Sequence, residues 1–292
     1  MKQRLFKHIM TLLFLFTALY AIGQDEKLYT EIFTKTTRVI SDFEVIDTSN
    51  ICVLYTMNAD EKQANKIDFC EDLQVLEIGN NISKYYSYFL FKSDSITEIA
   101  NRKLIGRLHS PLELKGIPSW SEFFKDFKTG ILTEYARMPV YIPNFHYSET
   151  ITDQNWELLE DTLTVAGYLC QKAQCRFRGR NYTAWFALDI PVNNGPWKFG
   201  GLPGLILKVS DDEKKFVFEC VEIKQNKNLI KTFDYNDYKK ITREKLLDLF
   251  NAIDKDYFKI SIRVTEVKYN TGIPIGKTKI RPKYNTMLLE LE

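Results

Sequence analysis

The stretch from Gly167 to Val209 constrains the fold more than any other part of the chain. Between Lys172 and Arg178, apolar and polar residues alternate one by one, which is the pattern of a strand with one buried and one solvated face. The residues Gly179-Arg180-Asn181 then supply a hairpin turn. A second strand follows over Tyr182–Leu188, where apolar or aromatic residues occupy both faces. This pattern is typical of a strand that is covered on both sides.

A tight turn is predicted at Leu202-Pro203-Gly204-Leu205. Pro203 fixes φ for the second position of a type II turn, and Gly204 accepts the positive φ that the third position requires. The turn leads into a strand over Leu205–Val209. We therefore expect the β segments before and after this turn to be partners in one sheet.

The six residues Gly201–Ile206 read GLPGLI. Matching residues flank them in order and spacing, namely Gly167-Tyr168, Cys170, Lys172-Ala173, Trp185, Ile190-Pro191 and Gly195-Pro196-Trp197-Lys198-Phe199. In these positions the chain resembles the GLPGLI family of secreted proteins from Gram-negative bacteria, which has no established biochemical role. One departure lies at Asn285-Thr286, where the resemblance implies an Asn-Pro pair before a Glu. That departure affects the expected packing of the last residues against the rest of the chain and leaves the resemblance itself unchanged.

Strands and helices are also predicted outside this stretch. The further strands are Leu28–Ile40, Ile51–Met57, Leu73–Ile78, Tyr85–Phe91, Ile131–Met138, Val140–Phe145, Trp156–Leu163 and Lys214–Ile223. The helices are one capped by Asp94 or Ser95 and reaching Leu108, one over Ser119–Phe127 and one over Thr242–Phe258 with Thr242 as N-cap. These elements predict a β-rich α+β fold. We expect a large, curved, mostly antiparallel sheet with about three helices covering one face, a balance that also fits a carrier-like half barrel.

The N-terminal sequence predicts export. Basic Lys2, Arg4 and Lys7 precede an apolar run over Ile9–Tyr20, and small residues follow up to Gly23. That run is shorter than the about 20 residues that a membrane-spanning helix needs. We therefore expect a signal peptide over residues 1–23, a single β-rich domain over 24–270 and a tail over 271–292, with no transmembrane segment after cleavage. The expected location is the periplasm or the extracellular space.

The charge balance disfavours nucleic acid as a partner. Lys+Arg (40) exceeds Asp+Glu (38) by two in the whole chain, and residues 1–23 contain three basic and no acidic residues. The mature chain therefore has a net charge of −1. Nucleic-acid-binding proteins carry a basic patch or stripe, which this balance does not provide.

The five cysteines predict up to two disulfides and one free thiol, because an exported chain enters an oxidising compartment. The candidates are Cys52, Cys70, Cys170, Cys175 and Cys220, and their pairing cannot be read from the sequence. The spacing of Cys170 and Cys175 is not that of a zinc site, so no metal and no cofactor is expected.

The sequence has few residues suited to catalysis. After export only His109 and His146 remain, and neither an H-E-x-x-H nor a G-x-S-x-G motif is present. A hydrolase would need one of these histidines or a pair of acids, with Asp189 as the first suspect. The sequence therefore favours a non-enzymatic role.

A binding role is suggested by the aromatic residues of the loop before Leu205. The candidate surface for a ligand or partner is Trp185, Trp197, Phe199, Gly201, Leu202, Pro203 and Gly204. Large apolar side chains on an exposed loop are usually covered by a ligand, a partner protein or another part of the same chain. The alternative is that the loop plugs one end of the sheet core. We expect an envelope-associated protein that binds an apolar or peptide ligand or a protein partner, or else an interaction module for an outer-membrane receptor or transporter, or a hydrolase.

Overall fold

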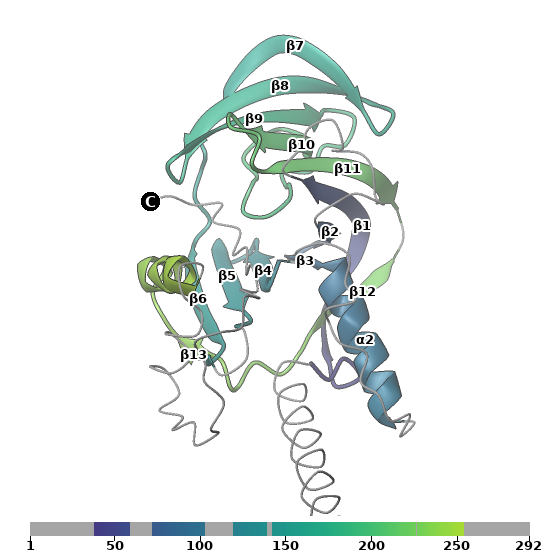
Figure 1. Cartoon of the computed structure of the whole chain (residues 1–292). Helices are drawn as coiled ribbons and strands as arrows, with labels where there is room; N and C mark the ends of the chain where they lie inside the picture. The colour runs from purple at the N-terminus through teal and green to yellow at the C-terminus, as the bar shows by residue number, and fades with distance from the viewer. Residues whose placement is uncertain (1–37, 59–71, 103–118, 139–141, 226, 254–292) are drawn as a thin grey trace, which may run out of the picture.

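The computed structural model describes residues 38–58, 72–102, 119–138, 142–225 and 227–253 (Figure 1). They form one open sheet of 13 strands in the order β13-β6-β5-β4-β3-β2-β1-β11-β10-β9-β8-β7, with β12 paired to β1. The elements are β1 (Glu44–Asn58), β2 (Asp72–Gly79), β3 (Ile82–Ser87), α2 (Tyr88–Arg102), β4 (Ser121–Asp126), β5 (Ile131–Ala136), β6 (Phe145–Thr150), β7 (Glu157–Val165), β8 (Tyr168–Phe177), β9 (Arg180–Ala187), β10 (Leu205–Asp211), β11 (Val217–Lys224), β12 (Asn228–Thr232) and β13 (Lys239–Lys240). Only β13 pairs in parallel, with β6, so the expected β-rich and mostly antiparallel fold is confirmed.

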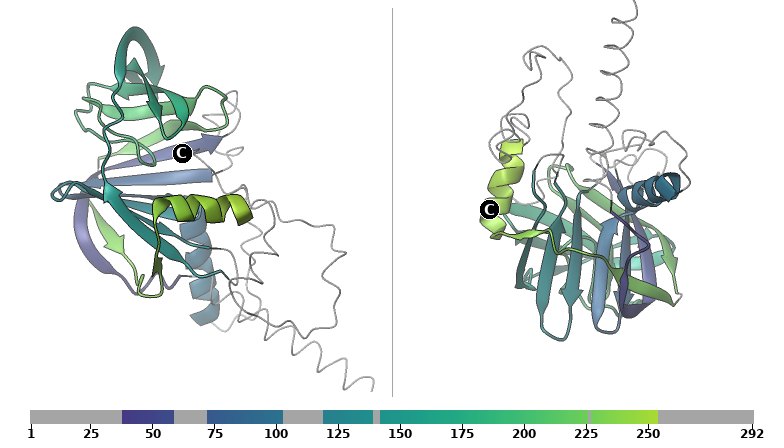
Figure 2. Two further views of the ribbon diagram at one scale, coloured as in Figure 1. Left: turned by 90° about the vertical axis from the view of Figure 1, so that its left-hand side faces the viewer. Right: turned by 90° about the horizontal axis from the view of Figure 1, so that it is seen from below.

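The sheet is strongly bent, so that β7 to β10 run crosswise to β4 to β6 (Figures 1 and 2). The 15-residue strand β1 lies at the bend, where its first half pairs with β12 and its second half with β11. The inside of the bend is packed with side chains. Tyr55, Tyr182, Phe186, Phe199 and Phe218 are among the largest fully buried ones, and they belong to one core cluster that spans both parts of the sheet. The described interior is therefore filled rather than hollow.

The helix α2 begins earlier than predicted. The Ser87 hydroxyl accepts a hydrogen bond from the backbone N–H of Leu90 at 3.1 Å, so Ser87 is the N-cap instead of Asp94 or Ser95. The expected strand over Tyr85–Phe91 is correct only up to Ser87, because the chain turns into α2 at that cap.

The predicted helix over Ser119–Phe127 is wrong, because Ser121–Asp126 is the strand β4. Its two central aromatic residues point to opposite faces of the sheet. Phe123 joins the main core, and Phe124 packs edge-on against Tyr135 on the other face. A strand with apolar residues on both faces accounts for the aromatic residues of this segment as well as the apolar stripe of a helix does.

The two helical segments of the described chain lie on opposite sides of the sheet (Figure 2). The segment 243–253 packs Leu246 and Ile253 near Tyr147, whereas α2 places Phe91 against Tyr86. The register puts Tyr85 in one row with Tyr147, so the adjacent Tyr86 faces the other way. The expectation of three helices on one face is therefore corrected. The predicted N-cap Thr242 is present, since its hydroxyl accepts a hydrogen bond from the N–H of Lys245 at 3.4 Å.

No disulfide is formed among the described cysteines, which corrects that prediction. Cys52, Cys170, Cys175 and Cys220 are all free, and Cys70 lies outside the described residues. Cys175 is on β8 and Cys220 is on β11, with β9 and β10 between them in the sheet. Both face the same core, yet the intervening strands keep them apart.

Several further predictions are corrected or lie outside the described residues. The strand expected over Val140–Phe145 is wrong, because β6 starts only at Phe145. Most of Leu28–Ile40 is outside the description, and its described end is not a strand. The tail over 271–292 and the signal segment 1–23 also lie outside it. Among the described helices, none is long and apolar enough to cross a membrane.

Candidate functional site

The connection between β9 and β10 turns inward and covers the core face of the sheet. Trp197 and Phe199 are 3% and 0% exposed, respectively. The Phe199 ring packs against Tyr182 with centroids 4.8 Å apart and against Trp197 at 5.1 Å. At the same time, Lys125 of β4 donates to the carbonyl oxygen of Phe199. The loop therefore joins the two crossing parts of the bent sheet.

The predicted type II turn at Gly204 is not formed. Gly201 has a positive φ of 81°, whereas Gly204 is not among the residues with positive φ. Glycine is required at position 204 for another reason. A Cβ there would lie 2.1 Å from the carbonyl oxygen of Ala187 and 2.6 Å from its carbon. Only glycine permits this close approach of β9, and the predicted pairing of β9 with β10 is confirmed.

An open pocket of about 720 Å³ lies beside this loop. We call it the loop pocket. Its walls come from β1, the end of β2, β4, the connection between β6 and β7, and the connection between β9 and β10. The lining residues are Asn50, Ile51, Ile78, Gly79, Asn80, Lys125, Phe127, Ile151, Thr152, Asp153, Gln154, Pro191, Val192, Asn193, Lys198, Gly200 and Gly201. Amide side chains and exposed backbone give these walls many hydrogen-bonding groups.

The glycine wall of the loop pocket is held in place by hydrogen bonds. The N–H of Gly200 donates to Oε1 of Gln154 at 3.1 Å, and the N–H of Gly201 donates to Oδ1 of Asn193. The indole N–H of Trp156 donates to the carbonyl of Gly200 at 2.7 Å. These contacts fix the backbone of the pocket before any ligand arrives, which lowers the entropic cost of binding.

Two buried lysines reach the loop pocket from the core side. Lys198 lies 3.4 Å from a carboxylate oxygen of Glu149 and 3.7 Å from one of Glu134, and it also contacts the Tyr147 hydroxyl. Lys125 donates to Oδ1 of Asn194 at 2.8 Å and to the Phe199 carbonyl at 2.5 Å. Burial lowers the pKa of Lys125 to about 7.

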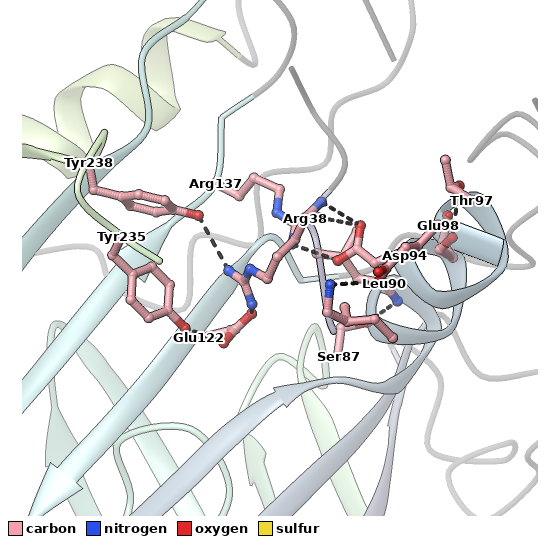
Figure 3. Close-up of polar contacts among 12 residues, drawn as sticks. Arg38, Ser87, Leu90, Asp94, Thr97, Glu98, Glu122, Arg137, Tyr235 and Tyr238 are labelled. Carbon is pink, nitrogen blue, oxygen red and sulfur yellow. Dashed lines mark hydrogen bonds and ion pairs between the residues drawn. The ribbon is translucent and has the colours of Figure 1, made fainter. Parts of the chain in front are cut away.

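A second polar cluster lies on the opposite face of the sheet and fastens α2 and the chain before β1 (Figure 3). Arg137 makes two hydrogen bonds to the Asp94 carboxylate, at 2.8 and 3.0 Å. Arg38 pairs with Glu122, which also accepts from the Tyr235 hydroxyl. Although burial alone raises the pKa of Glu122, its cationic neighbours lower it to about 2. Each carboxylate in this cluster is already paired with an arginine, so the cluster is a structural clamp that fastens α2 and the chain before β1 to the sheet.

The structure separates most of the residues that the sequence suggested as a surface. Trp197, Phe199 and Leu202 are buried, so the loop plugs the core as the alternative reading expected. Trp185 is half-buried on the far side of β9, with Lys172 over its ring at 5.8 Å. Of the seven candidates, Gly201 alone lines the loop pocket, while Pro203 is exposed and Gly204 is buried. A role of this loop in ligand binding stays a prediction.

Sequence reasoning missed the residues that give the pocket its chemistry, above all Lys125, Asn193 and Gln154. Lys125 lies in the segment read as a helix, where it appeared as an ordinary polar position. Asn193 and Gln154 stand in two connections far apart in the sequence. No spacing in the sequence signals that these segments meet.

The residues proposed for hydrolysis do not form a site in the described chain. His109 is outside the described residues, and Asp189 is exposed. The His146 ring stacks on Tyr135 with centroids 5.6 Å apart. The described part of the chain has no group of three or more His, Cys, Asp and Glu side chains suited to a metal ion.

Comparison with known sequences gives a short match. Residues 178–208 match a family described as "Protein of unknown function (Porph_ging)". The matched segment starts at the turn between β8 and β9 and ends in β10, so it contains the entire inward loop. No curated protein matches the chain.

Among solved structures, six chains match. Two structures of PNGF-II are 17% and 16% identical, with TM-scores of 0.46 and 0.45. Each match covers 70% of this chain, and 33% or 32% of the PNGF-II chain. The chain thus spans about a third of the length of these PNGF-II chains. At this level of similarity the match supports no argument about activity.

Proposed function

We propose that this chain is an exported, envelope-associated binding protein of the GLPGLI type that holds a polar ligand, such as a peptide segment, in the loop pocket. The observation that carries the proposal is the pocket of about 720 Å³ with its hydrogen-bonded glycine wall. Ligand sites in proteins occupy about 300–1,000 Å³ and are largely formed before binding. The family resemblance and the signal-like N-terminus support export to the periplasm or beyond.

The chemistry of the walls favours a polar ligand over an apolar one. Nδ2 of Asn50 donates to Oδ1 of Asn80 at 2.7 Å, which leaves the oxygen of Asn50 and the amide nitrogen of Asn80 for a ligand. Such groups match the N–H and C=O groups of a peptide. An apolar ligand in the bend of the sheet has less support, because aromatic side chains fill that space.

Native mass spectrometry of the protein purified from its own host tests the proposal. We expect a co-purified ligand that is lost when the pocket is filled by Thr152→Trp, because Thr152 is an exposed residue of the pocket lining. The matched control is Thr150→Trp, two residues away, exposed and outside the lining. A protein without any bound ligand, or a ligand kept by the Thr152 variant, would count against the loop pocket.

Two other roles have less support. A hydrolase that uses His146 lacks a partner, because no described Ser, Cys or carboxylate side chain hydrogen-bonds to its imidazole. An interaction module for an outer-membrane receptor or transporter stays a prediction that concerns residues 271–292. A pull-down with and without those residues tests it. Identical partners in both cases, or none, would count against the tail.

A further inference from the structure

Three lysines of the described chain are almost fully buried, and they differ in their partners. Lys84 lies 3.5 Å from a carboxylate oxygen of Glu122, and Lys198 is paired with Glu149 and Glu134. Lys125, which is 4% exposed, has no carboxylate partner among the described residues. Its two partners are neutral oxygens. A buried ammonium without a counter-charge is unfavourable, so this environment favours the neutral amine.

The hydrogen bonds of Lys125 fit a neutral amine. A neutral amine has two N–H groups and one lone pair. Oδ1 of Asn194 and the carbonyl of Phe199 accept two hydrogen bonds from Nζ, which uses both N–H groups and leaves the lone pair unbonded. Because burial lowers its pKa to about 7, the neutral form of Lys125 is well populated near neutral pH. In an ordinary lysine at neutral pH, the neutral fraction is roughly a thousandfold smaller.

A second buried group, the Asn194 carboxamide, positions the amine of Lys125. Asn194 is fully buried, and its Oδ1 accepts from both Lys125 and the N–H of Gly195. Its Nδ2 has no hydrogen-bond partner among the described residues. Buried donors without partners are rare, and their positions call for an explanation. Here the same carboxamide orients the amine and keeps an unbonded N–H group beside it.

We propose that Lys125 is a nucleophilic amine that captures the aldehyde or ketone group of a polar ligand in the loop pocket as an imine. This inference rests on the proposed function, because the ligand occupies the same pocket, and it names the ligand class. The Nζ lone pair forms a bond to the carbonyl carbon, and the C=O π electrons move to oxygen, which takes up a proton as the amine loses one. The hydroxyl group then leaves as water with a solvent proton, and the nitrogen loses its last proton. Amine and carbonyl thus give imine and water, and no oxidant is needed.

The two neighbours have distinct positioning roles in this step. Asn194 lies behind the pocket lining, and its Oδ1 orients Nζ toward the pocket. The carbonyl of Phe199 keeps the nitrogen in place through an N–H that remains in the intermediate. Lys198, in the same pocket and equally buried at 3% exposed, forms ion pairs with two glutamates, so its nitrogen is engaged and does not react.

Reductive trapping tests the inference on the full-length protein. The protein is incubated at pH 7 with glycolaldehyde and sodium cyanoborohydride, and the alkylated lysines are mapped by peptide mass spectrometry. We expect Lys125 to be alkylated at least tenfold faster than Lys198 or the exposed Lys92, with a rate that rises to half its maximum near pH 7. Alkylation of Lys125 no faster than that of Lys92 would overturn the inference.

Variants make the result specific. Lys125→Met should lose the fast-reacting site, and Lys92→Arg, at an exposed lysine outside the pocket lining, should keep it. Asn194→Asp places a carboxylate next to Nζ, so we expect the pH midpoint of Lys125 alkylation to move upward, whereas a merely structural role would leave the midpoint unchanged. A ligand that co-purifies with the protein while Lys125 stays unreactive would overturn this inference and leave the proposed function intact. Fast alkylation of Lys125 without any co-purified ligand would support this inference and count against the proposed function.

Discussion

At the scale of single residues, buried charges are arranged in two ways. On one face of the sheet, Arg137 and Glu122 have full partners, and these pairs fix the geometry of the clamp. On the core face, Asp72 and Lys125 are buried with neutral partners only. Burial raises the pKa of Asp72 to about 7 and lowers the pKa of Lys125 to about 7. These two groups therefore change charge near neutral pH inside the protein.

Asp72 is expected to make stability depend on pH. Its carboxyl titrates near 4 in the unfolded chain and at about 7 in the folded protein. Between these values the folded protein keeps a proton that the unfolded chain has lost. The free energy of unfolding therefore falls as pH rises from about 4 to about 7, by up to about 1.4 kcal/mol per pH unit for this group.

The measurement is denaturant unfolding across that pH range. Asp72→Asn should flatten the slope by the share of this one carboxyl, whatever the variant's absolute stability. Asp189→Asn changes an exposed carboxyl and is the matched control, expected to keep the wild-type slope. An Asp72→Asn protein with the same slope as the wild type would contradict the assignment.

Gly204 gives the second prediction at this scale. Gly204→Ala should lower the free energy of unfolding by about 1–3 kcal/mol, because its Cβ meets the Ala187 backbone and β9 must move. Urea unfolding measures the effect. In the control Gly200→Ala, the nearest atom to the new Cβ is a side-chain oxygen of Asn193 at 3.3 Å, so a smaller loss is expected. Equal losses in both variants would contradict the close-approach argument.

At the scale of elements, the cap of α2 connects the helix to the core. The Ser87 hydroxyl accepts from the N–H of Leu90 and donates to Asp72 at 2.7 Å. Ser87→Ala removes both bonds, so we expect a loss of about 1–2 kcal/mol in the free energy of unfolding. Ser95→Ala, at the position that the sequence suggested as a cap, lies inside the helix and should cost nothing. Chemical denaturation of the two variants distinguishes them, and equal effects would contradict the observed cap.

The elements that were predicted correctly from the sequence are those whose residue pattern fits only one type of secondary structure. Residues 182–188 and 205–209 alternate or lie between strong turn signals, so their strands and their pairing were predictable. Ser119–Phe127 was not, because its aromatic residues fit a helical stripe and also a strand with two apolar faces. Tertiary packing decides between these structures, and one sequence does not contain that information. The loop pocket was unpredictable for the same reason, since five separate segments build it.

At the scale of the whole molecule, the bent sheet depends on the inward loop. The Phe199 ring lies against Tyr182 of β9, and its carbonyl accepts from Lys125 of β4. Lys198, next to it, contacts Tyr147 of β6. These contacts join strands that are far apart in the order of the sheet. The two parts of the sheet should therefore unfold together in one transition.

Removing the ring of Phe199 is expected to weaken this coupling. Phe199→Ala should lower the free energy of unfolding by about 3–5 kcal/mol, because the side chain is 0% exposed and leaves a cavity between the two parts of the sheet. Phe127→Ala, at a 40% exposed phenylalanine, is the control and should cost much less. The chain has four tryptophans, of which Trp156 and Trp197 lie near the loop. Unfolding followed by tryptophan fluorescence should coincide with unfolding followed by circular dichroism in the wild type and separate from it in Phe199→Ala. Coincident curves in the variant, with a loss no larger than that of the control, would mean that the loop does not couple the two parts.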